Sequence, residues 1–177
     1  AALALVGAFA LAQPTVDGTI AEGEYANTLA HEESGAVLHW TVDDVTLHMA
    51  YTLPADGWAG IGWLGEQTNR KAGADEQIVT VVDGAPVVLD YYQAGARGEP
   101  ELDTEEGGTN SFTETSAAHV DGVWTVEFTR PLATGEETDV DIVPGMPMMF
   151  LIAHSNVMDV SRQHPRDERW YIEDFTF

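Results

Sequence analysis

A single lysine, Lys71, stands on a chain of 177 residues that carries 30 acidic side chains. It lies in the stretch NRKAGADEQIVTVVDG, in a glycine-containing loop just before an apolar run. A neutral lysine amine can bind a metal ion, whereas a protonated one pairs with carboxylates such as the nearby Asp75 or Glu76. The residue types alone leave both roles open.

Histidines supply the second possible chemistry. The chain has no cysteine, so any metal must use histidine, methionine, lysine, carboxylate or backbone oxygen. If Asp43-Asp44 forms a two-residue turn, the flanking apolar runs pair so that His39 faces His48. Two imidazoles about 5 Å apart can chelate copper, with His154 as a third ligand. A polar pair on a solvated sheet is the plainer alternative.

Positive charges gather near the C-terminus, where Arg162, Arg166 and Arg169 surround His164. Arginine binds carboxylates through two parallel hydrogen bonds, so this cluster is suited to hold an anion. It would equally serve to neutralise part of an acidic surface. Both interpretations remain open from these residues.

The overall charge limits the partners. The formal net charge is −23, which opposes binding to nucleic acid or to an anionic membrane surface. Such acidity suits a protein in salt, or one that meets a basic partner or a cation. No serine-hydrolase, P-loop or dinucleotide-binding glycine pattern occurs. The many carboxylates follow from composition and do not indicate glycoside hydrolysis.

The first 12 residues are apolar and end in Ala10-Leu11-Ala12, an A-x-A cleavage pattern before Gln13. We interpret residues 1–12 as the remnant of a secretory signal or as an N-terminal anchor, since they are too few to span a bilayer. The protein is therefore expected in the periplasm, the cell envelope or the extracellular space. Residues 13–177 are long enough for one folded domain.

Short apolar runs alternate with turn residues along the whole domain, and none has a helical period. Asp83-Gly84 and Asp121-Gly122 are typical hairpin turns. This pattern predicts an all-β fold with one long acidic loop over residues 93–110. The expected strands are 36–42, 46–53, 58–64, 76–82, 86–92, 111–120, 123–130, 147–154 and 169–175.

Several motifs together resemble the DOMON domain family. They include GWAGIGW, GAD before a strand, EFTRPL followed by D-x-D, and a histidine after the last long strand. The similarity extends in order over almost all of the chain after the first 12 residues. It implies an extracytoplasmic, immunoglobulin-like antiparallel β-sandwich that binds haem b or, in some branches, sugars.

The resemblance also implies two iron ligands. In the haem-binding branch these are a methionine in an M-x-G-A-D pattern and a histidine after the late strand. The histidine position corresponds to His164, but Lys71 occupies the methionine position. Either a deprotonated Lys71 coordinates the iron, or this branch has lost the ligand and binds no haem.

We therefore expect an exported haem-b domain for electron transfer, with Lys71 and His164 as iron ligands and a redox protein or envelope complex as partner. A copper protein of the superoxide dismutase kind, using the histidines named above, is one alternative. A carbohydrate-binding or envelope interaction module without haem is another. The expected haem pocket walls are Trp58, Trp63, Met148 and Phe150, with Arg162 or Arg166 as propionate partners.

Overall fold

The computed structural model describes residues 13–65 and 71–177. The expected signal remnant or anchor, residues 1–12, lies outside the described part of the chain. Within the described residues no helix is long and apolar enough to cross a membrane. The only helical element in these two ranges is a single 3-10 turn, Asp103–Glu105.

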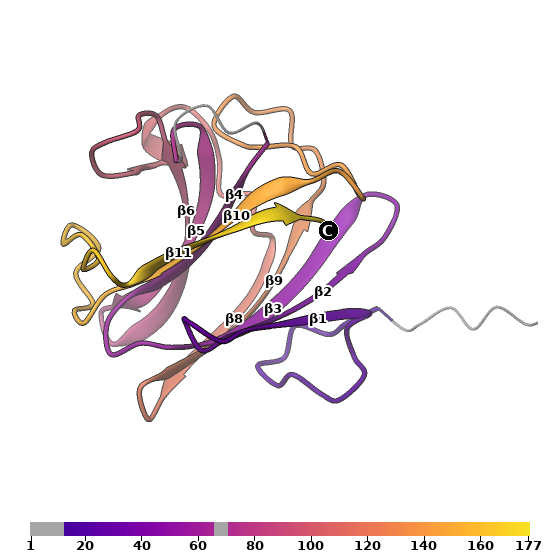
Figure 1. Cartoon of the computed structure of the whole chain (residues 1–177), viewed down its shortest axis with the longest axis horizontal. Coiled ribbons are helices and arrows are strands. Elements are labelled where there is room, and N and C mark those ends of the chain that lie inside the picture. The colour runs from indigo at the N-terminus through magenta and orange to yellow at the C-terminus, as the bar shows by residue number, and fades with distance from the viewer. Residues whose placement is uncertain (1–12, 66–70) are drawn as a thin grey trace, which may run out of the picture.

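Two antiparallel sheets face each other and form a β-sandwich (Figure 1). The first sheet has the strand order β1-β2-β3-β9-β8 and the second has the order β11-β10-β4-β5-β6-β7. The first sheet consists of β1 (Asn27–His31), β2 (Ala36–Val42), β3 (Thr46–Pro54), β9 (Val123–Pro131) and β8 (Glu114–Val120). The second consists of β11 (Arg169–Phe175), β10 (Met148–His154), β4 (Ala59–Leu64), β5 (Ala74–Val82), β6 (Ala85–Gln93) and β7 (Glu101–Leu102). The all-β sandwich expected from the sequence is confirmed.

Tight turns join neighbouring strands where aspartate-glycine pairs occur. Asp83 and Asp121 have φ values of 51° and 52°, and the following Gly84 and Gly122 also have positive φ. Two successive residues with positive φ make the kind of turn whose twist matches that of paired strands. These turns connect β5 to β6 and β8 to β9, as the dipeptides predict.

The first hairpin departs from its predicted register. His39 pairs with Ala50 and Thr41 pairs with His48, so the expected pairing of His39 with His48 is wrong. The reason lies in the turn, where an Asp43 carboxylate oxygen accepts hydrogen bonds from the main-chain N–H groups of Val45 and Thr46. This longer turn shifts the register by two residues, which leaves every side chain on its expected face.

The core lies between the sheets and follows the period-two alternation of the strands. In β2 and β3 the inward residues include Leu38, Trp40, Met49 and Tyr51, all buried. The second sheet contributes inward side chains in the same way, while its outward residues form smaller separate clusters. The outer face of this sheet is therefore partly covered, and its cover forms a pocket.

Candidate functional site

A pocket of about 310 Å³ lies on the outer face of the second sheet. Its floor is formed by β4, β5, β10 and β11. Gly60 and Gly62 lack side chains on this face of β4, so the floor stays open there. Leu151 and Ile78 give the floor an apolar surface beside these glycines. The volume lies in the range of small-molecule and cofactor sites.

Two loops cover this floor and supply most of the polar groups. One is the Ala96–Pro100 stretch after β6, and the other is the Val160–His164 part of the β10–β11 loop. Trp58 fastens the second loop, because its main-chain N–H donates to Val157 O and its indole Nε1 donates to Arg162 O. The pocket is thus a cleft between the outer face of the second sheet and two loops.

His164 faces the pocket as an imidazole suited to act as a ligand. Its Nδ1 lies 2.8 Å from the main-chain oxygen of Pro165 and donates a hydrogen bond to it. That bond fixes the tautomer and leaves Nε2 free for a metal. Burial lowers the pKa of His164, so the neutral ring dominates near pH 7. The Trp58 ring packs edge-on against it with centroids 6.3 Å apart.

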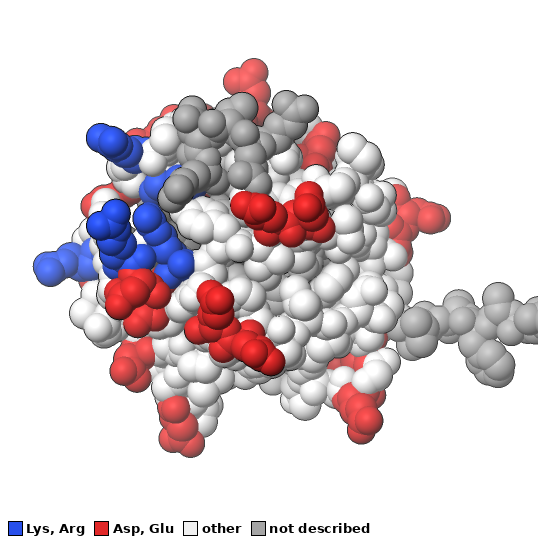
Figure 2. All heavy atoms as spheres, in the orientation of Figure 1, with Lys and Arg blue, Asp and Glu red and all other residues white. Residues whose placement is uncertain are grey.

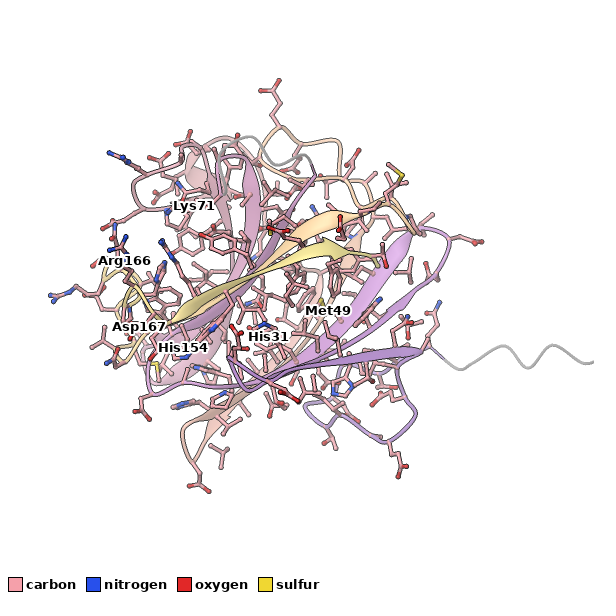
Figure 3. The ribbon with its side chains drawn as sticks, in the orientation of Figure 1. His31, Met49, Lys71, His154, Arg166 and Asp167 are labelled. Carbon is pink, nitrogen blue, oxygen red and sulfur yellow. The ribbon has the colours of Figure 1, made fainter. Side chains whose placement is uncertain are left out.

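Lys71 lines the same pocket, 93 positions earlier in the sequence. Its Nζ donates a hydrogen bond of 2.9 Å to the main-chain oxygen of Gly98 in the covering loop. Lys71 lies at the same end of the molecule as Arg166 of the β10–β11 loop (Figure 3). The two residues assigned as iron ligands by the resemblance, Lys71 and His164, are therefore brought together.

Charged side chains also reach the pocket floor from two strands, Glu76 from β5 and Arg169 from β11. Burial raises the pKa of Glu76 to about 7, although the charge of Lys71 opposes this rise. Arg169 also lowers the pKa of His164 by repelling the imidazolium form. Arg169 was expected only as part of the basic cluster near the C-terminus. It lies at the start of β11 and lines the pocket, whereas Arg162 and Arg166, the expected propionate partners, do not.

Five of the six lysine and arginine residues in the described part of the chain lie in or near this pocket, and the sixth, Arg130, is buried in the core. Figure 2 shows the lysine and arginine side chains grouped in one part of the face it displays. Lys71, Arg97 and Arg169 line the pocket, and Arg162 and Arg166 extend from the loop that covers it. On a chain of net charge −23 this is a local concentration of positive charge, although Glu76 and Glu99 also line the pocket. It favours a ligand that carries negative charge at the pocket mouth.

Several residues expected at the pocket lie elsewhere. Trp63, Met148 and Phe150 belong to the core between the two sheets, because strand alternation turns them inward. Arg162 and Arg166 are exposed and do not line the pocket. Among the expected walls, Trp58 alone takes the predicted place.

The three histidines proposed for copper do not converge. His39 contacts the Thr28 hydroxyl at 3.0 Å on the first sheet. His48 is buried and lies 3.2 Å from an Asp43 carboxylate oxygen. His154 is on the second sheet, and its Nε2 lies 2.9 Å from a Glu168 carboxylate oxygen. The register shift and the separation between sheets explain why no copper site forms from this set.

Comparison with models of protein families identifies the family of this chain. Residues 32–155 match the model of the DOMON domain, which is more than half of the sequence. The chain belongs to the DOMON family, a family of extracytoplasmic domains. The matched region includes Lys71 and most of the pocket floor, and it ends before His164.

Sequence similarity to individual proteins is low. No curated protein matches the sequence. A carbohydrate binding module of family 9 from Caldicellulosiruptor kristjanssonii, solved in complex with glucose, is similar to this chain in structure. It shares 12% sequence identity, with a TM-score of 0.45, over 86% of this chain and 78% of that chain.

Proposed function

We propose that the pocket binds haem b, that His164 and Lys71 would bind its iron, and that the domain transfers electrons. One observation carries this proposal. Two residues far apart in sequence, each at a ligand position of the haem-binding branch, line one pocket with a partly apolar floor. A random arrangement of the single lysine and six histidines would not be expected to give this convergence.

The residues present fit such a cofactor. His164 offers Nε2 while Nδ1 is held by Pro165 O. Trp58, Ile78 and Leu151 provide apolar contacts for a porphyrin, and Arg169 can bind a propionate. To bind the iron, the Lys71 amine would have to give up its hydrogen bond to Gly98 O. It would also have to lose a proton, because only a neutral amine can bind a metal.

Haem supplies a one-electron iron couple when it is bound, and ligand identity and burial set its potential. Two protein ligands leave no open coordination position, which favours electron transfer over oxygen or substrate chemistry. A redox protein or an envelope complex would then be the partner. The basic side chains near the pocket would face this partner, whereas acidic side chains are scattered over the rest of the face that Figure 2 displays.

The test is an absorption spectrum of the protein after haem reconstitution. The wild type should give a Soret band and sharp α and β bands on reduction. His164→Ala should lose the low-spin spectrum, and Lys71→Ala should convert it to a high-spin form. Lys71→Met should restore a six-coordinate, low-spin iron, because thioether sulfur also binds haem iron.

His39→Ala is the matched control, since His39 lies on the first sheet and does not line the pocket. It should leave the spectrum unchanged. The proposal fails if no Soret band appears after reconstitution. It also fails for Lys71 as a ligand if Lys71→Ala keeps the wild-type low-spin spectrum.

A saccharide is the second candidate ligand. Trp58 and Tyr171 line the pocket together with the polar groups of Glu76 and Gln163. Aromatic rings beside hydrogen-bonding side chains are suited to bind sugar rings. Titration calorimetry of the haem-free protein with mono- and oligosaccharides tests this role. Saturable heat that disappears in Trp58→Ala, without any Soret band in the reconstituted wild type, would favour the sugar.

A further inference from the structure

A second cluster of chemically competent side chains lies on the opposite face of β5 from the pocket. Asp75 at the start of β5 and Asp90 in β6 are 0% and 2% exposed. The Asp139 side chain, from the segment after β9, is fully buried. One carboxylate oxygen of each lies within 4.8 Å of the others. Among residues 13–65 and 71–177, no other group of histidine and acidic side chains is arranged to hold a metal ion.

Charge is not balanced in this cluster. Arg130 is fully buried and lies 2.5 Å from an Asp75 oxygen and 3.3 Å from an Asp139 oxygen. The cluster therefore contains one positive guanidinium group and three carboxylates. A fourth buried carboxylate, Asp103, interacts electrostatically with Asp90. Burying uncompensated negative charge is costly, so a further cation or bound protons must neutralise it.

Unused oxygen atoms point to a cation. Asp75 Oδ1, Asp90 Oδ1 and Asp139 Oδ2 are buried and accept no hydrogen bond. Buried polar atoms are almost always bonded, so three such oxygens from three neighbouring carboxylates need an explanation. The other Asp75 oxygen is already occupied by Arg130 and the Val140 N–H. The free oxygens are the hard, anionic donors that calcium binds.

We propose that Asp75, Asp90 and Asp139 bind a divalent cation of the calcium class. Calcium accepts irregular shells of protein oxygens, whereas magnesium demands a near-ideal octahedron and retains several waters. The ion would join β5 and β6 to the irregular segment that carries Asp139, between β9 and β10. It is a structural site, separate from the pocket because Glu76 points outward where Asp75 points inward.

The experiment uses the full chain after removal of metals with a chelator. Calcium is added alone, and binding is followed by calorimetry and by the unfolding temperature. Binding should saturate at one ion per chain, and the unfolding temperature should rise with the logarithm of free calcium above Kd. Tb³⁺ should also bind and emit on excitation of Trp63, whose ring lies 5.3 Å from the Arg130 guanidinium carbon.

Asp139→Asn should raise the Kd for calcium at least tenfold. Asp141→Asn is the matched control, because Asp141 is exposed in the same segment and should bind calcium as the wild type does. If Asp139→Asn does not fold, the wild-type titration decides alone. The site is refuted if the stripped wild type shows no saturable binding and no rise in unfolding temperature. Equal weakening by Asp141→Asn would also refute it, since it would indicate general charge screening.

Discussion

Replacing the buried Arg130 by methionine should be among the most damaging single substitutions in the chain. The side chain is fully buried, and Nη2 donates to Asp75 Oδ2 and Val140 O. Nε donates to Ser111 Oγ and Nη1 to Pro131 O. Methionine matches much of the volume, so the cavity contribution is small. Removing one partner of a buried ion pair lowers the free energy of unfolding by about 3–5 kcal/mol, and we expect a decrease of this size for Arg130→Met near pH 7.5.

The size of this loss should depend on pH. Arg130 opposes the increase that burial causes in the pKa of Asp75, so the variant takes up a proton more readily. One extra bound proton reduces the deficit by up to about 1.4 kcal/mol for each unit of pH decrease. Urea unfolding followed by tryptophan fluorescence in calcium-free buffer measures both effects. Arg97→Met, at an exposed position, is the control and should change stability by less than about 0.5 kcal/mol.

A loss below about 1 kcal/mol at pH 7.5 would show that Arg130 does not hold the carboxylates in place. A large loss that stays constant between pH 7.5 and pH 5 would contradict the proton-uptake reasoning. In that case packing around the methionine, and not charge, would dominate the change.

Two further predictions concern stability. Gly57→Ala should cost about 1–3 kcal/mol in urea unfolding, because a Cβ there would collide with main-chain atoms of Val157, whereas Gly65→Ala faces open space and should be nearly neutral. Calcium-free protein should unfold at higher temperature at pH 5 than at pH 8. Burial raises the pKa of Asp90 to about 6 and of Asp103 to about 7, so the folded state binds protons that the unfolded state does not. This stability is fully present below the unfolded pKa and is lost as the pH rises through these two values. Asp103→Asn should flatten the pH profile, and an unfolding temperature that falls between pH 8 and pH 5 would contradict the reasoning.

Most of the sandwich could be predicted from local patterns. Every strand expected from the alternation of apolar and turn residues is present within a few residues of its predicted bounds. The short edge strands β1 and β7 were missed, because Asn27–His31 and Glu101–Leu102 have few apolar residues and are largely exposed. An edge strand is held by main-chain hydrogen bonds to one neighbouring strand. These bonds impose little pattern on its side chains, so the sequence does not reveal the strand.

The site was predictable in part. The positions of Lys71 and His164 came from motif resemblance, and packing brings both into one pocket. Trp63 was misplaced because aromatic residues suit a core and a cofactor pocket equally well. Only knowledge of which face of β4 points inward separates these roles. The buried carboxylates were not predictable. The chain has 30 acidic residues, and nothing in the sequence distinguishes the few that are buried from the many that are exposed.

The β10–β11 loop, one of the two loops that cover the pocket, is anchored to the sandwich through main-chain oxygens. The indole of Trp58 binds Arg162 O, and the hydroxyl of Thr80 binds Met158 O. These two anchoring bonds use only main-chain oxygens of the loop, so they do not depend on the identity of its side chains. Substitutions at the exposed loop positions, and even at His164, can accumulate without loss of the fold. Ligand specificity can thus diverge between related domains while the scaffold stays the same, and an engineer could vary this loop with little risk to folding.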